Sequence, residues 1–489
     1  DAFLALNQET ADINDILPII AFYNDSYTGA PSKTIQNQMF DGFYDVWVRQ
    51  LMDELAFVYK DGGASYEGPS YGPEVMTNLL PGVAAFSSAL NVDYALSQPF
   101  FMRYPQYLIA NTKPYTIKQL AGTANVGPDG NPVSGFINFT YYPNWGHIAA
   151  APAPVGDTGD CRQARMISGF LRTRNSDAAG LAKWHSQLGR CRILIERSAG
   201  GALWGNAMLY YFLFGNKDIA IKTPESVMNL TEKLGQEMFT IRTGYDLPYN
   251  DQYNNDTFIV FWASENFVGN GRQRHNYGHF VIDKFGALAV KSGNSKSGVC
   301  FFNNLPDDTA FYHNVVLDGS QDFPNPGSLN QIIEKGELLA EDINNGAYDY
   351  LFYDNTPVWT NPGERNLSQR EFLYLRGPLN KEYVVVFDRT RFAGTNKVWQ
   401  MWTAVPPTIP GSLSEPVEIT NNYQSVDTAE DSATLKNHGR MFVKTLYPSS
   451  FTRSTATTFT CPSDFGREFV GWGKLDISAN TDAFLNVMQ

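Results

Sequence analysis

Phe258-Ile259-Val260-Phe261-Trp262 is the stretch that decides the fold of the second half of this chain. Its β-branched and aromatic side chains favour a buried β-strand. Similar runs occur at Tyr383-Val-Val-Val-Phe387 and Met441-Phe-Val-Lys-Thr445, each bounded by turn residues. From about residue 236 onward the pattern predicts many short strands without helices between them, which implies antiparallel sheets stacked as a β-sandwich.

Residues 1 to about 235 show a helical period instead. Apolar residues recur three and four apart at Phe40, Phe43, Tyr44, Trp47, Leu51, Leu55 and Val58, which gives one buried stripe on a helix. Further helices are predicted around 73–90, 163–171 and 203–214. We therefore expect two domains in this chain of 489 residues, a helical one over 1–235 and a β-sheet one over 236–489.

Composition restricts the partners. The chain is 43% hydrophobic and 18% charged, as in globular proteins, and its net charge of -13 opposes binding to nucleic acid or an acidic membrane. No apolar run is long enough to predict a membrane span. A polyanionic ligand would need a local basic cleft. The segment from Cys161 to Gly200 offers one, because it contains eight Lys or Arg but only two acidic residues. The alternative is that these residues form a solvated basic helix face.

The four cysteines, Cys161, Cys191, Cys300 and Cys461, do not have the spacing of a zinc ribbon, and one disulfide within each half is compatible with their positions. The chain opens at Asp1 without a signal segment, as a processed form or a fragment would. We expect a secreted or periplasmic location. The sequence does not indicate an oligomeric state.

Three of the six histidines, His275, His279 and His313, fall among strand signals in the early β half. Titratable side chains are costly to bury unless they are paired, so these histidines are predicted to line a cleft or to bind a ligand. The alternative for each is a hydrogen-bonded structural role.

Several blocks in order carry a resemblance to a known family. They are Asp61-Gly-Gly-Ala-Ser-Tyr-Glu-Gly-Pro-Ser-Tyr-Gly72, Arg272-Gln-Arg-His-Asn-Tyr-Gly-His-Phe280 with the hairpin to Gly293, His313-Asn-Val-Val-Leu-Asp-Gly319, Glu382-Tyr-Val-Val-Val-Phe-Asp-Arg389 and Gly439-Arg-Met-Phe-Val-Lys-Thr-Leu-Tyr-Pro448. Together they resemble the heparinase II/III-like polysaccharide lyases, the alginate lyase and heparinase type. The resemblance implies an α+β multidomain fold, with an incomplete (α/α) toroid followed by an antiparallel β-sandwich.

The resemblance also implies a reaction, the β-elimination of an anionic, uronic-acid-containing polysaccharide. Tyr71 would protonate the leaving glycosidic oxygen and could also act as the base. His275, with Arg274 and Tyr277 beside it, would complete the site from the β half. The residues expected to contact the substrate are Glu67, Trp145, Arg165 and Arg272.

The chain departs from the family pattern at two points. Relatives often carry a structural zinc; His275 and His313 match two of its ligands, but Lys291 or Ser292 stands where an aspartate belongs. We expect the chemistry to require no cofactor, and a structural zinc stays open. The residue that neutralises the substrate carboxylate is also unassigned. Asn14 is one candidate, and an arginine is the other.

Two other functions compete with a lyase. A glycoside hydrolase would need two carboxylates about 5 to 10 Å apart, for which Asp61 and Glu67 are candidates, but nothing pairs them with a second acidic site. A non-catalytic carbohydrate-binding or structural protein on a lyase-derived scaffold is the alternative from another class, because fold does not dictate function. The sequence does not identify the uronic-acid polymer, nor endo or exo action.

Overall fold

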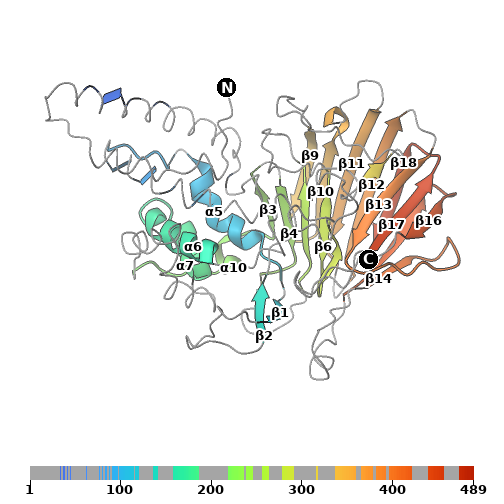
Figure 1. The fold of residues 1–489 in the computed structure, drawn as a ribbon, viewed down its shortest axis with the longest axis horizontal. Coiled ribbons are helices and arrows are strands. Elements are labelled where there is room, and N and C mark those ends of the chain that lie inside the picture. Colours follow the sequence, from blue (N-terminus) through green and yellow to red (C-terminus); the bar gives the residue numbers. More distant parts are fainter. Residues whose placement is uncertain are drawn as a thin grey trace.

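The computed structural model of the chain contains two large antiparallel β-sheets and a group of helices that lies beside one of them (Figure 1). The structure describes residues 34, 37–38, 41, 45, 62, 76, 80, 83–84, 87–88, 91–96, 98–114, 116–120, 136–140, 158–186, 218–235, 238–245, 256–263, 278–290, 315–317, 336–358, 365–377, 381–392, 396–420, 439–455 and 473–489.

The first sheet has nine strands in the order β16-β17-β13-β7-β6-β5-β4-β3, with β8 paired to β13. Its strands are β3 (Thr231–Leu234), β4 (Met238–Arg242), β5 (Phe258–Trp262), β6 (Phe280–Asp283), β7 (Ala287–Ala289), β8 (Val316–Leu317), β13 (Lys397–Thr403), β16 (Thr452–Thr455) and β17 (Gly473–Ala479). All pairings are antiparallel.

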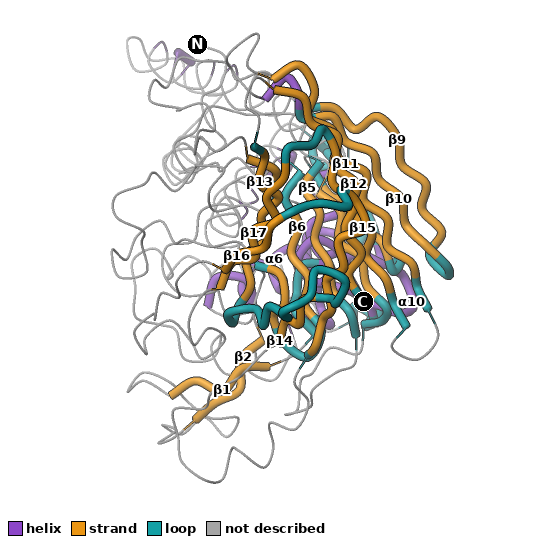
Figure 2. The backbone as a smooth tube through the Cα atoms, turned by 90° about the vertical axis from the view of Figure 1, so that its right-hand side faces the viewer, coloured by secondary structure: helices purple, strands orange, loops and turns teal. Residues whose placement is uncertain are grey.

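The second sheet has seven strands in the order β14-β15-β18-β12-β11-β10-β9, again antiparallel throughout (Figure 2). Its strands are β9 (Glu337–Asn344), β10 (Tyr348–Asp354), β11 (Arg365–Leu375), β12 (Tyr383–Phe392), β14 (Val417–Thr420), β15 (Arg440–Tyr447) and β18 (Ala483–Met488). A short 3-10 helix, η4 (Thr356–Val358), follows β10.

The α-helices whose bounds the described residues give come from the first half of the chain. They are α5 (Pro99–Ala110), α6 (Thr158–Leu171), α7 (Ser176–Ser186) and the single turn α10 (Pro224–Val227). Helices α5, α6 and α7 pack on one another. A small ribbon of β1 (Thr116–Leu120) and β2 (Phe136–Thr140) lies in the same half. None of the helices in the described ranges is long and apolar enough to span a membrane.

The nine-stranded sheet is buried on both faces at its strands β4, β5 and β6. Side chains alternate across a strand, and in β5 the positions of Phe258, Val260 and Trp262 belong to the hydrophobic cluster that contains the helices. Ile259 and Phe261 belong to the cluster shared with the seven-stranded sheet. Because both faces are covered, the strand is apolar at every position, as the sequence shows.

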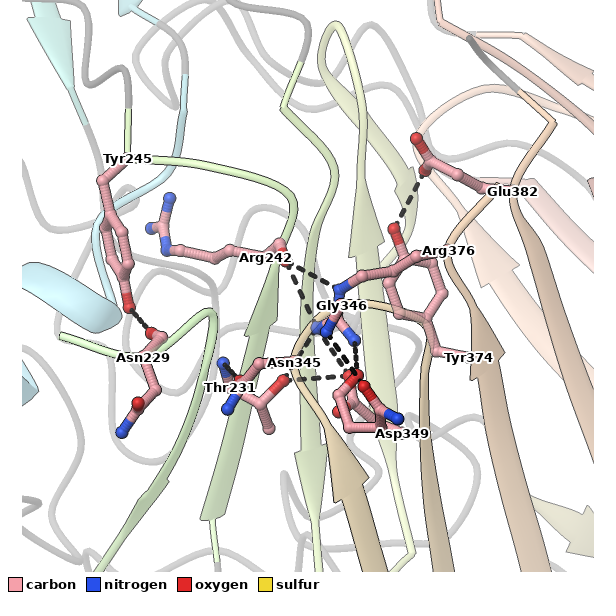
Figure 3. A network of polar contacts seen from close by, with 11 residues as sticks. Asn229, Thr231, Arg242, Tyr245, Asn345, Gly346, Asp349, Tyr374, Arg376 and Glu382 are labelled. Carbon is pink, nitrogen blue, oxygen red and sulfur yellow. Dashed lines mark hydrogen bonds and ion pairs between the residues drawn. The ribbon is translucent and has the colours of Figure 1, made fainter. Parts of the chain in front are cut away.

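A buried polar network ties the two sheets together at one edge (Figure 3). The Arg376 guanidinium, just after β11, lies 2.6 Å from the Asp349 carboxylate of β10 and donates to the Thr231 hydroxyl of β3 at 2.9 Å. Thr231 in turn donates to Asp349 at 2.9 Å, and Arg376 also donates to the carbonyl oxygen of Arg242 on β4. The contacts join strands from both sheets, so they fix how the sheets sit on each other.

Helix α5 and the residues just after it are attached to the other face of the nine-stranded sheet at three points. Arg103 pairs with Glu232 of β3 at 2.9 Å, Arg242 of β4 donates to the carbonyl oxygen of Ala110 at 3.2 Å, and Lys113 pairs with Asp283 of β6 at 3.2 Å. Strands β3 and β4 are neighbours in the sheet, and β5 lies between β4 and β6. The attachments therefore span four adjacent strands.

Glu232 is nearly buried at the first of these attachments. Burial raises its pKa above the ordinary value of 4.5, against the opposing effects of the Asn229 backbone N–H and the Arg103 guanidinium. The desolvation of this carboxylate therefore outweighs the two contacts that favour its charged form.

The predicted strands at 258–262, 383–387 and 441–445 are confirmed in β5, β12 and β15, and the predicted helix at 163–171 is confirmed in α6. The antiparallel character of the second half is confirmed for the described residues. The described helices do not establish an (α/α) toroid. The nine-stranded sheet begins at Thr231, a few residues before the predicted change of period, and the stripe at 40–58 lies almost wholly outside the described residues.

We expect Lys113→Met to destabilise the chain by about 3 to 5 kcal/mol, because it removes the cation that is paired with the buried Asp283 carboxylate. The double variant Lys113→Met/Asp283→Leu should recover most of that loss. Urea unfolding measures both. Lys222→Met removes an exposed ion pair to Asp177 and is the matched control, with an expected cost below about 1 kcal/mol. Equal costs for the two single variants would contradict the assigned role of Lys113.

The raised pKa of Glu232 predicts that the free energy of unfolding depends on pH. Its folded pKa is raised, so the stability gained from its protonated form is complete below the ordinary value of 4.5 and is lost as pH rises through the folded value. The unfolding free energy of the wild type, minus that of Glu232→Gln, should therefore fall as pH rises from 4.5 toward neutrality. Each unit of pKa shift corresponds to about 1.4 kcal/mol. Unfolding titrations at a series of pH values check this, and a difference that grows with pH would refute it.

Candidate functional site

Two segments singled out from the sequence enter the described structure at the same end of the nine-stranded sheet. Gly62, from the Asp-Gly segment, accepts a hydrogen bond at 3.0 Å from the N–H of Gly235, in the turn between β3 and β4. Gly278, from the His-rich segment, donates its N–H at 2.8 Å to the carbonyl of Trp262, the last residue of β5. Strands lie about 4.8 Å apart, so these attachments are separated by roughly 10 to 15 Å.

Gly62 sits tightly against the start of α5. Its φ is +80°, and a Cβ added there would lie 2.5 Å from the carbonyl oxygen of Pro99 and 2.9 Å from the Cβ of Arg103. A side chain at this position would be strained and would clash with the helix. Gly62 is therefore held against the first residues of α5, from Pro99 to Arg103.

Gly278 is held from the opposite side, by the seven-stranded sheet. The Arg370 guanidinium of β11 donates to the carbonyl oxygen of Gly278. Asp388 of β12 holds that guanidinium through two contacts of 2.7 and 2.9 Å, and the indole N–H of Trp399 donates to the same carboxylate at 3.0 Å. Paired, buried charges of this kind have a fixed geometry, so they set where the His-rich segment ends.

His279 is part of the core beside this site. Its ring stacks on Trp262 with centroids 5.1 Å apart and planes 11° apart, and both side chains are buried. Of the two interpretations that the sequence allowed for His279, the structural one is what the packing supports. His275 and His313 lie outside the described residues, so no contact of theirs enters this account.

Arg103 and Glu232 form the ion pair nearest to Gly62. The Arg103 side chain is 33% exposed, whereas that of Glu232 is 7% exposed. Both Glu232 oxygens accept, Oε1 from the Asn229 N–H at 2.8 Å and Oε2 from Arg103 at 2.9 Å. The pair thus presents a partly exposed guanidinium, backed by a buried carboxylate, at the end of the sheet where Gly62 and Gly278 are attached.

Sequence reasoning missed Arg103, although a signal for it was present. It is the one charged residue in the twelve of Pro99–Ala110, in which most of the others are apolar or aromatic. A single charge on an apolar helix is costly to bury unless it has a partner. That partner, Glu232, lies far along the chain and gives no local pattern.

The basic segment after Cys161 is used in part for structure. Arg174 pairs with Asp93 at 2.7 Å and donates to the carbonyl of Phe170, and Lys183 donates to the carbonyl of Ile219. Arg172 is exposed, and Arg165 on α6 is half-buried. The contacts of Arg174 and Lys183 favour a structural role for these two residues over a basic cleft.

Most of the site residues predicted from the sequence lie outside the described residues and stay predictions. They are Asn14, Glu67, Tyr71, Trp145, Arg272, Arg274, His275, Tyr277 and His313. The same holds for the ligands of the zinc left open above. The described residues contain no group of three or more His, Cys, Asp and Glu side chains that could hold a metal ion.

No family model matches the chain, and no curated protein matches its sequence. Among solved structures it is similar to heparinase III, with a TM-score of 0.51 and 13% identity over 98% of this chain and 63% of that one. It is also similar to heparan sulfate lyase HepC from Pedobacter heparinus, with a TM-score of 0.50 and 15% identity over 98% of this chain and 62% of that one. The chain therefore spans less than two thirds of either lyase, and at these identities the likeness shows a heparinase-like fold.

Proposed function

We propose that the chain is a polysaccharide lyase that cleaves an acidic, uronic-acid-containing polysaccharide by β-elimination. The observation that carries the proposal is the attachment of the Asp-Gly and His-rich segments, at Gly62 and Gly278, to one end of the nine-stranded sheet. The likeness of the fold to heparinase III and to a heparan sulfate lyase supports it. Tyr71 follows Gly62 in the first segment, and His275 precedes Gly278 in the second.

The proposed reaction needs three kinds of group. A base removes the proton on the carbon next to the carboxylate, the electron pair forms a carbon-carbon double bond, and the bond to the glycosidic oxygen breaks. An acid then protonates that oxygen. In this proposal Tyr71 is the acid and a candidate for the base, and His275, with Arg274 and Tyr277, completes the site from the β half. The other proposed substrate contacts are Glu67, Trp145, Arg165 and Arg272.

Arg103 is the proposed partner of the substrate carboxylate, in place of Asn14. The proton beside a carboxylate is barely acidic, and negative charge builds up on that carboxylate as the proton leaves. A positioned guanidinium stabilises such charge, and it binds carboxylates through parallel hydrogen bonds. Arg103 has a partly exposed side chain, and Glu232 orients it at 2.9 Å. Asn14 lies outside the described residues.

The remaining parts of the proposal follow from the resemblance. They comprise an incomplete (α/α) toroid before a β-sandwich, an anionic polysaccharide as partner, and a secreted or periplasmic location. No step of the proposed reaction requires a cofactor. The non-catalytic carbohydrate-binding alternative predicts binding without turnover, so one experiment separates it from the lyase.

We expect the purified chain to increase ultraviolet absorbance when it is incubated with one of a panel of uronic-acid polysaccharides, which would comprise heparan sulfate, hyaluronan, alginate and ulvan. Elimination leaves a conjugated double bond, whereas hydrolysis leaves none. Tyr71→Phe should lower the rate about 10²- to 10⁴-fold, the usual contribution of a general acid or base. The rate constant per folded enzyme is the quantity compared.

Tyr348→Phe is the matched control for the loss of a tyrosine hydroxyl. Tyr348 donates to Asp342 on an exposed part of β10 and β9, so its loss should leave the rate unchanged. If binding persists on some polymer while absorbance stays flat on all of them, the non-catalytic alternative replaces the lyase.

We expect Arg103→Gln to lower kcat about 10²- to 10³-fold, the usual effect of removing one donor that faces developing charge. Arg103→Lys should restore part of the rate, because an ammonium keeps the charge without the guanidinium geometry. Methyl esterification of the substrate carboxylate should remove most of the difference between the wild type and Arg103→Gln. Steady-state kinetics on the two substrate forms measures this.

Two controls separate this role from a structural one. Arg103→Gln/Glu232→Gln avoids leaving Glu232 unpaired, and it should be as slow as the single variant. Arg174→Gln removes another half-buried ion pair on the helical side, to Asp93, and it should lower stability but not kcat. If Arg103→Gln lowers stability while kcat per folded enzyme is kept, Arg103 is structural.

A further inference from the structure

A cavity of about 370 Å³ that is partly open to solvent lies between the two sheets. Its walls come from β6 and the hairpin after it, and from β11, β12, β15 and β18 of the seven-stranded sheet. Its lining includes Lys284, Leu288, Tyr374, Glu382, Arg440 and Met441. Ligand pockets have volumes of this order, from about 300 Å³ upward.

The cavity lies away from the candidate site described above. Tyr374, which lines it, is four residues along β11 from Arg370, the residue that holds Gly278, and this corresponds to about 13 Å. On β6 the cavity is at the Lys284 end, whereas Gly278 precedes the other end. A ligand here would therefore not compete with one at Gly62 and Gly278.

A polar cluster centred on Glu382 forms one side of the cavity. Lys284 donates to Oε1 of Glu382 at 2.8 Å, and the hydroxyl groups of Tyr374 (3.1 Å) and Thr257 donate to Oε2. Figure 3 shows the Tyr374 hydroxyl pointing at this carboxylate. Burial, and then the charge of Glu382, raise the pKa of Tyr374, so its hydroxyl keeps its proton and acts as the donor.

Most of the unused hydrogen-bonding capacity of this cluster consists of donors. The Glu382 carboxylate already accepts three hydrogen bonds of the about four that it can take, whereas the Lys284 ammonium has three N–H groups and meets one partner among the described residues. Arg440 supplies a second cation at the rim; its Nε contacts Glu418 at 3.2 Å, and its side chain is 66% exposed. Two cations and one carboxylate therefore line the cavity, which favours a ligand with an anionic acceptor group.

The rest of the lining indicates the chemistry of the ligand outside its anionic group. Most of it is aliphatic, aromatic or thioether, from residues such as Leu288, Met441 and Met488. Such walls leave the hydroxyl groups of a sugar ring without partners, which is costly. Methionine side chains adapt to irregular apolar shapes. An unbranched hydrocarbon chain can pack against these walls without leaving a polar group unpaired, whereas a sugar cannot.

We propose that this cavity binds a small monocarboxylate with an apolar tail, whose carboxylate is held by Lys284 and Arg440 and whose tail lies against Leu288, Met441 and Met488. The proposal does not depend on lyase activity. The site would be a second ligand site of the chain, at the end of the inter-sheet core remote from the candidate active site.

Calorimetric titration of the full chain with decanoate, decanol and decyltrimethylammonium tests this, since the three probes share a tail and differ in their head group. Decanoate should bind at least tenfold more tightly than decanol, and decyltrimethylammonium more weakly than either. Galacturonate, an anion without an apolar tail, should not bind. If decanoate and decanol bind equally, or if no probe binds, the proposal is overturned.

Variants locate the site. Lys284→Met/Glu382→Gln removes the ion pair without leaving a lone buried charge, and it should weaken decanoate at least tenfold while leaving decanol within about twofold. Lys233→Met/Glu341→Gln removes a more exposed ion pair between the same two sheets and should change neither. If the first variant fails to fold, Arg440→Gln, at an exposed position, should still weaken decanoate severalfold. Unchanged decanoate affinity in Arg440→Gln and in the double variant would refute the site.

Discussion

The structure depends on a sheet in which the strands β4, β5 and β6 are buried on both faces. In the middle of the nine-stranded sheet, Trp262 packs toward the helices while Phe261 packs toward the seven-stranded sheet. A shift of one residue in strand register would exchange the two faces. It would also turn Arg242 away from α5 and Thr231 away from Asp349. Two features therefore fix the strand register. One is the apolar packing, and the other is the set of polar contacts, which join one face of the sheet to α5 and the other face to the seven-stranded sheet.

How far the sequence predicts the fold follows from this constraint. Strands such as β5 and β12 have either continuous or alternating apolar residues, so their own sequence indicates them. Strand β3, with the sequence TEKL, is mostly polar and gives no such signal. Its polar side chains are accommodated because Glu232 meets Arg103, Thr231 meets Asp349 and Lys233 meets Glu341. Those partners are more than a hundred residues away, so a local pattern cannot reveal them.

The same limit applies to the candidate site. Residue type alone singled out His279, yet its ring is stacked on Trp262 within the core. Arg103 gave no motif, yet it is the partly exposed cation beside Gly62. The order of the blocks could be predicted because it lies in the sequence itself. Which side chains stay exposed depends on packing between layers. The packing of α5 on β3 leaves the Arg103 side chain partly exposed.

The same electrostatic arrangement occurs at both ends of the nine-stranded sheet, on its helix-facing side at one end and between the two sheets at the other. At each end a mostly buried carboxylate, Glu232 or Glu382, accepts hydrogen bonds from its neighbours and holds a cation, Arg103 or Lys284. In each pair the cation is a hydrogen-bond donor, so it can bind an acceptor on a ligand. Both ends therefore favour anions, and the surroundings decide which one. Around Lys284 the walls are apolar and exclude a sugar, whereas Arg103 lies where two chain segments with polar and aromatic residues attach to the sheet.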